Sequence, residues 1–126
     1  KITFSGGTAA DNDAIVITAT AGESAGNEIT ATVSVSDTTN LEVAPASLTL
    51  AADGALSGKS VTLSVKASAT GKALPESITS ITVGGSALDA ANYSYDKATG
   101  KITFSGGTAA DNDAIVITAT AGESAT

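Results

Sequence analysis

The chain has 126 residues, of which 42% are apolar, and its six lysines face 13 acidic residues for a formal net charge of -7. It lacks His and Cys, which excludes a disulfide-stapled module and argues against acid–base or thiol catalysis, so we expect no enzyme and no catalytic residues. Scattered lysines on an acidic chain argue against a nucleic-acid partner. The sequence contains no apolar run of about 18 residues, so we expect no membrane insertion in this segment.

One segment of the sequence occurs twice. Residues 1–25, KITFSGGTAADNDAIVITATAGESA, return letter for letter at residues 101–125. Identity over so long a stretch does not arise by chance, and the spacing indicates a tandem repeat of a 100-residue, domain-sized unit. We therefore expect residues 27–126 to be a complete module, and residues 1–26 to be the C-terminal hairpin of a preceding repeat or a pair of exchanged strands. An engineered duplication is a third interpretation.

Apolar residues alternate with polar ones along most of the chain, a period typical of half-buried strands. In the first copy the pattern predicts strands at residues 2–4 and 14–20, which are too small to be stable alone. The alternation slips by one between Ile78 and Ile81, which predicts a bulge or a bend. The remaining predicted strand faces are Ile29 to Val35, Leu48 with Leu50, Val61 to Ala69, Tyr93 with Tyr95, Ile102 with Phe104, and Ile115 to Ala119.

Segments rich in Gly, Asn, Asp, Ser and Thr separate these strands, as turns require. The abundance of Val, Ile and Thr favours pleated structure, and no segment supports more than a helical turn around residues 87–92. We predict an all-β fold of seven or eight short strands in a two-sheet sandwich. The predicted turns are residues 37–40, 53–58, 71–76, 84–85, 96–100 and 106–113.

Residues 80–121 contain a strand ending at Gly84-Gly85, then Leu88, the Tyr93-x-Tyr95 strand, a turn ending at Gly100, the Ile102-x-Phe104 strand, an acidic turn and Ile115-x-Ile117. This order resembles the second half of bacterial immunoglobulin-like modules, including the X2-type modules found beside carbohydrate-binding domains. The resemblance implies an immunoglobulin-like β-sandwich. It leaves the function open, because such modules serve in surface-layer proteins, adhesins, cellulosomal scaffolds and phage structural proteins.

An acidic triplet is the candidate metal site. Residues Asp11-Asn12-Asp13, repeated as Asp111-Asn112-Asp113, could coordinate Ca²⁺ through carboxylate and amide oxygens. A full site needs six or more oxygens, the neighbouring Thr8 and Thr108 add one hydroxyl each, and no Glu follows at EF-hand spacing. The sequence therefore favours a hairpin turn and no metal or other cofactor, with calcium as the alternative.

Two other residue groups have a functional and a structural interpretation. Tyr93 and Tyr95, flanked by Asn92 and Asp96, could stack on a sugar, but burial in a core that has few other large residues is the favoured role. A Lys-to-Asn cross-link would need a buried lysine, whereas the alternation places Lys66 on a polar face.

These features favour a structural repeat module of a bacterial extracellular fibre, adhesin stalk or surface-layer protein, acting as spacer and assembly unit. Its expected partners are neighbouring copies of the same repeat, joined covalently or by strands exchanged between subunits into a homopolymer. Residues 28–35 and 114–120 would carry the load, across a short link at residues 21–27. The alternatives are a carbohydrate-binding accessory module and an immunoglobulin-like domain of a phage tail or capsid protein.

Overall fold

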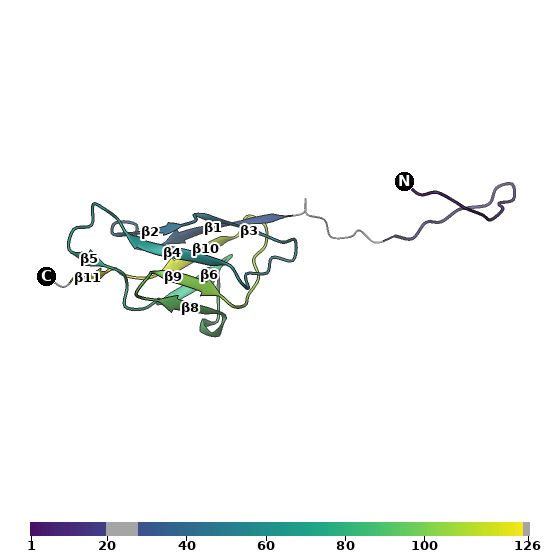
Figure 1. The fold of residues 1–126 in the computed structure, drawn as a ribbon. Coiled ribbons are helices and arrows are strands. Elements are labelled where there is room, and N and C mark those ends of the chain that lie inside the picture. The colour runs from purple at the N-terminus through teal and green to yellow at the C-terminus, as the bar shows by residue number, and fades with distance from the viewer. Residues whose placement is uncertain (20–27, 125–126) are drawn as a thin grey trace.

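Residues 28–124 form an all-β sandwich (Figure 1). The computed structural model describes residues 1–19 and 28–124. In these residues eleven strands occur, which is more than the predicted seven or eight, and eight of them have four or more residues. In chain order the elements are β1 (Ile29–Val35), β2 (Leu41–Ala44), β3 (Ser47–Leu50), β4 (Ser60–Val65), β5 (Lys72–Ala73), β6 (Ser80–Val83), β7 (Ser86–Ala87), the 3-10 helix η1 (Ala90–Asn92), β8 (Tyr93–Asp96), β9 (Lys101–Phe104), β10 (Ala114–Thr118) and β11 (Gly122–Glu123).

Two sheets enclose the core. One has the strand order β3-β1-β10-β6-β7 and the other the order β2-β4-β9-β8, while β5 and β11 form a separate pair. Neighbouring strands are antiparallel except β1 and β10, which run parallel with Thr32 opposite Ala114 and Val35 opposite Ile117. The second copy of the repeated segment therefore supplies an interior strand to each sheet.

The core between the sheets is aliphatic, as the composition predicts. Alternation along β1 buries Ala31, Val33 and Val35, and their polar neighbours face solvent, as expected for a strand with one covered face. Phe104 is the largest fully buried side chain. No buried polar or charged residue occurs in the described residues.

The structure shortens one predicted strand and adds a strand that was not predicted. The strand predicted to continue to Ala69 ends at Val65, because the Ala69 N–H donates to the Lys66 carbonyl in a turn. Strand β2 (Leu41–Ala44) was missed, since only two of its residues are large and apolar. The slip before Ile81 corresponds to irregular chain that precedes β6.

The strands predicted in the first copy are absent from the described residues 1–19, which form an open chain with a turn at residues 11–12. The physical reason is that a strand is stable only when a neighbour pairs with it and a core covers one face. The last predicted residue of the second strand, Thr20, and the link at residues 21–27 lie outside the described residues.

Gly100, directly before the repeated segment, lies at a close approach between two backbones. Its φ is +79°, and a Cβ added there would lie 2.2 Å from the Leu63 carbonyl oxygen. The Leu63 N–H donates to the Gly100 carbonyl at 2.8 Å, and the Gly100 N–H donates to that of Asp96 at 2.7 Å. This residue therefore closes the β8–β9 turn and sets β9 beside β4.

We predict that Gly100→Ala destabilises the sandwich more than Gly85→Ala. Both glycines have positive φ, +79° and +85°, but nothing lies within 4 Å of a Cβ at Gly85. The left-handed backbone alone should cost Gly85→Ala about 1–2 kcal/mol. The forced backbone shift should bring the cost of Gly100→Ala to about 3 kcal/mol or more. Urea unfolding measures both losses, and equal values would show that the close approach has no effect.

Candidate functional site

The candidate site is the pair of positions that the second copy occupies in the sandwich. The β9 slot lies between β4 and β8, where Ile102 is opposite Val61 on one side and Tyr95 on the other. The β10 slot lies between β1 and β6, where Ile117 is opposite Val35 on the β1 side. Each slot therefore has a strand on both sides, and an occupant can pair with both.

Apolar side chains of the second copy fill the core beneath both slots. Ile102, Ile115 and Ile117 have no exposed surface, and Phe104 is 1% exposed. Fully burying a side chain of this size stabilises a fold by about 1.5–3 kcal/mol. The occupant of the slots therefore contributes much of the free energy that holds the two sheets together.

The loop between β9 and β10 crosses from one sheet to the other and is fixed at Gly107. Its carbonyl accepts from the Leu56 N–H at 3.0 Å. A Cβ added to Gly107 would lie 2.6 Å from Leu88 Cδ1 and 3.5 Å from Leu56 Cδ1. The Gly-rich stretch therefore lets two leucine side chains pack directly against the backbone.

The acidic turn of the second copy attaches β10 to the start of β1. Asp111 Oδ1 accepts from the Thr30 N–H at 2.9 Å, and the Asn112 N–H donates to the Thr30 carbonyl at 2.8 Å. Asp113 Oδ2 accepts from the Ala110 N–H at 2.8 Å, which closes the turn. Within the described residues no group of three or more His, Cys, Asp or Glu is placed to hold a metal ion. These contacts favour a turn over calcium. The predicted hairpin is wrong, however, because β9 and β10 lie in different sheets and do not pair with each other.

Ser36 and Asp37 hold the chain where it leaves β10. The Ala119 N–H donates to Ser36 Oγ at 3.2 Å, and the Ala121 N–H donates to Asp37 Oδ2 at 3.2 Å. Hydrogen bonds from the Asn40 side chain and from the Ala121 N–H hold the pKa of Asp37 below its usual range. The sequence predicted a turn at residues 37–40 but not this contact, because its partners are 84 residues apart.

Tyr93, Tyr95 and Lys66 have structural surroundings. The Tyr95 hydroxyl donates to the Pro75 carbonyl at 2.9 Å, and burial, followed by nearby carboxylate charges, raises the pKa of Tyr95. Both tyrosines are partly buried and pack against the core, which agrees with the structural role that the sequence favours. The Lys66 ammonium donates to the Thr38 carbonyl in an exposed bond, which is not the buried setting that a Lys-to-Asn cross-link needs.

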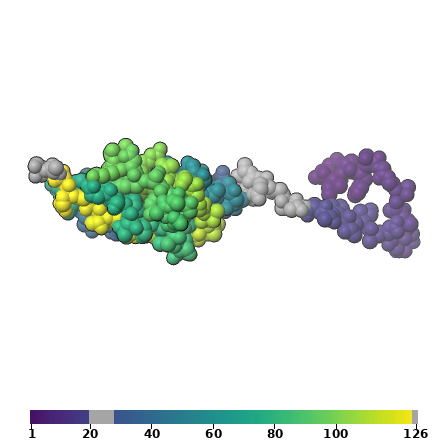
Figure 2. Space-filling model, turned by 90° about the horizontal axis from the view of Figure 1, so that it is seen from below, coloured from purple at the N-terminus to yellow at the C-terminus, as the bar shows by residue number. Residues whose placement is uncertain are grey.

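The first copy exposes the side chains that the second copy buries. Phe4 is 66% exposed where Phe104 is 1% exposed, and Ile15 is 66% exposed where Ile115 is fully buried. Among the described residues it makes no hydrogen bond with residues 28–124, and it lies apart from the sandwich as an open loop (Figures 1 and 2). It therefore carries apolar surface without a partner.

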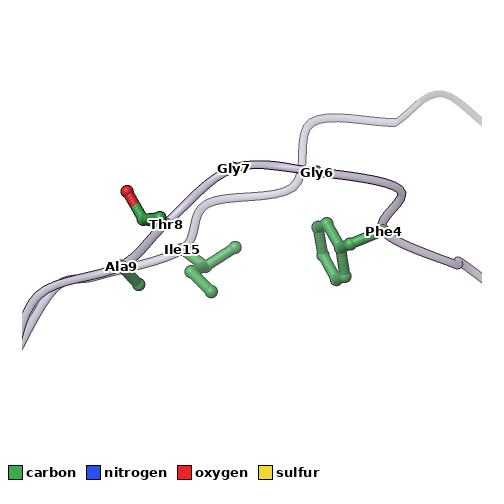
Figure 3. Close-up of a pocket in the computed structure, with 6 residues that line it drawn as sticks. All are labelled: Phe4, Gly6, Gly7, Thr8, Ala9 and Ile15. Carbon is green, nitrogen blue, oxygen red and sulfur yellow. The ribbon is translucent and has the colours of Figure 1, made fainter.

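Part of this apolar surface lines a hollow in the first copy. Phe4 and Ile15 point to the same side of the loop in Figure 3, below Gly6 and Gly7. In the second copy, Leu56 and Leu88 pack against the corresponding Gly107. The first copy therefore lacks the core side chains that its sequence packs against elsewhere in the chain. The hollow has a volume of about 280 Å³ and is lined by Phe4, Gly6, Gly7, Thr8, Ala9 and Ile15.

The acidic turn has the same geometry in both copies. Asn12 and Asn112 both have φ of 67°, in the left-handed region that Asn tolerates. The Ala10 N–H donates to Asp13 Oδ2 at 2.7 Å, as its counterpart does at 2.8 Å in the second copy. Local hydrogen bonds alone therefore determine this turn, whatever surrounds it.

Comparisons of the chain with protein-family models, with curated proteins and with solved structures gave no match. Of the residues that the structure describes, none lies in a helix long and apolar enough to cross a membrane. The sandwich, its two slots and the exposed first copy are therefore the basis for a functional proposal.

We predict that Asp37→Asn weakens the attachment of residues 119–124, the exit segment that follows β10, in a pH-dependent way. The folded pKa of Asp37 lies below its unfolded value of about 3.9. The carboxylate therefore contributes stability above that pH and loses it as the pH falls through the folded pKa. The variant should have a lower Tm than the wild type at neutral pH, and the gap should narrow below about pH 4. Thermal unfolding across this range would contradict the assignment if the gap stayed constant.

Proposed function

We propose that residues 28–124 are a load-bearing structural module of an extracellular bacterial repeat protein, such as a fibre, an adhesin stalk or a surface-layer component. On this proposal the module is an immunoglobulin-like sandwich, repeated every 100 residues, that acts as spacer and assembly unit. The observation that carries the proposal is the parallel pairing of the first and last long strands, β1 and β10.

Parallel pairing of the terminal strands determines how a pulling force acts on the sandwich. The chain enters at the start of β1 and leaves after the end of β10, so tension along the chain acts on opposite ends of the pair. The hydrogen bonds between these strands then share the load instead of opening one at a time. Two further bonds flank the pair: the Thr32 N–H donates to the Asp113 carbonyl at 3.0 Å, and the Ser36 N–H donates to the Ile117 carbonyl at 2.8 Å.

Contacts beyond β10 extend this hold toward the end of the module. Strand β11 pairs with β5, and the Lys72 ammonium lies 2.5 Å from the Glu123 carboxylate. An exposed ion pair of this kind contributes at most about 1 kcal/mol. Its role in the proposal is to keep the exit segment aligned with the sandwich.

Composition supports a module used in series outside the cell. Residues 27–126 contain five lysines and ten acidic residues, so each repeat would carry a net charge of about -5. Mutual repulsion would keep an array of such modules soluble and extended. The absence of cysteine is compatible with an oxidising environment.

We predict that the sandwich resists force in a direction-dependent way. Because the chain has no Cys, engineered cysteines give unique handles. Handles in the Glu28→Cys/Ser124→Cys variant shear β1 against β10, and the force at unfolding should be high. Unfolding should release about 330 Å of chain in one step, at roughly 3.4 Å per residue. Single-molecule force spectroscopy measures both quantities.

The matched control is Glu28→Cys/Ala110→Cys, in which both handles lie at the same end of the β1–β10 pair. This direction opens the hydrogen bonds one after another, so the unfolding force should be several-fold lower. Ala110 is exposed and takes part in its turn only through its own backbone atoms, so the substitution should leave the sandwich intact. Equal forces in the two directions would refute a load-bearing role for this pair.

A further inference from the structure

We propose that residues 1–19 of one chain can insert into the sandwich of a second copy of this chain when that copy's own β9 and β10 are out of their slots. The partner is thus another molecule with the same sequence, and the binding sites are its β9 and β10 slots. This inference rests on the proposed function, since it names how modules on separate chains would join. Backbone pairing with existing strands would provide affinity, and apolar side chains would provide register.

Sequence identity gives the donor the same side chains that β9 and β10 of the second copy place in the slots. In the β9 slot, Ile2 would take the position of Ile102, opposite Val61. In the β10 slot, Ile17 would take the position of Ile117. Because each side chain matches the one that now fills the position, insertion leaves no cavity and buries no unpaired charge.

Within the part of the chain that the structure describes, the donor has no partner on the face that would insert. Phe4 and Ile15 are each 66% exposed and point to the same side of the loop (Figure 3). Gly7 also lines the hollow between them, and its counterpart Gly107 packs against Leu56 and Leu88 in the second copy. Core leucines of another sandwich are therefore the occupants that this surface fits.

The bend that the donor needs is already formed. The acidic turn has the same φ at Asn12 as at Asn112, and the same internal hydrogen bond to its second aspartate. In the occupied slot, Asp111 and Asn112 each form a hydrogen bond with the backbone of Thr30. The counterparts in the first copy are exposed and available to another chain's β1. A preformed turn lowers the entropy lost on insertion.

Connectivity favours insertion into another chain over insertion into the donor's own sandwich. Within one chain, residue Thr18 would lie at the far end of β10, whereas Ile29 begins the parallel neighbour β1. Only ten residues, 19–28, connect them, and a crossover between adjacent parallel strands needs a dozen or more. Between chains this restriction does not apply. In the wild type, however, each sandwich has its own second copy tethered beside the slots. That copy competes with the donor for the slots at a high effective concentration.

The test disables the second copy in the full chain. In Ile115→Asp/Ile117→Asp, two fully buried positions of β10 become charged, so the chain's own β10 cannot enter its slot. The first copy is unchanged, and we expect folded sandwiches that assemble head to tail. Circular dichroism should retain the β-sheet signal, and light scattering after gel filtration should give masses of two or more chains that fall on dilution.

Two control variants isolate the donor. The variant Ile15→Asp/Ile17→Asp changes only exposed residues, so it should remain a folded monomer with the wild-type Tm. The combination of all four substitutions leaves neither copy able to fill the β10 slot, and its sandwich should be lost. The first-copy substitutions should thus be harmless alone and disruptive only when the second copy is disabled.

Two results would overturn the proposal. If Ile115→Asp/Ile117→Asp is as unfolded as the fourfold variant, the first copy does not enter a slot. If it is a folded monomer, insertion occurs within one chain and creates no link. Either result leaves the load-bearing role of the wild-type sandwich untouched, because the direction dependence of its unfolding force tests that role separately.

Discussion

The sandwich depends on one constraint, which is that the repeated segment supplies an interior strand to each of the two sheets. Strand β9 separates β4 from β8, and β10 separates β1 from β6. Without them each sheet divides into two parts that share no hydrogen bonds, and the core loses Phe104 and three isoleucines. Residues 28–100 therefore contain the outer parts of both sheets but not the strands that join them.

The two copies separate local from tertiary causes of structure. The acidic turn forms in both copies, because its hydrogen bonds join residues three apart in the sequence. Strands form only in the second copy, where neighbours pair on both sides and a core covers one face. This difference places the functional interest at the junction between modules, where an apolar strand pair needs a sandwich and a sandwich needs a strand pair.

Much of the fold could be predicted from sequence, and the failures have physical reasons. Alternation identified the buried faces of β1 and β10, because one side of each strand faces the core. It could not predict the parallel pairing of β1 with β10 or the contact between Asp37 and Ala121, since distant residues form both. Nor could it choose between identical copies. Connectivity determines that the second copy occupies the slots, because the tight turn ending at Gly100 leads directly from β8 into β9.

Residue-resolved amide hydrogen exchange on the full chain tests most directly whether only the second copy occupies the slots. Residues 15–17 and 115–117 have the same sequence and the same neighbours, so their intrinsic exchange rates are equal and any difference reports structure. Amides at 115–117 should exchange only when the sandwich opens, whereas those at 15–17 should exchange near the intrinsic rate. Equal protection of the two copies would contradict this account, since it would mean that both share the slots.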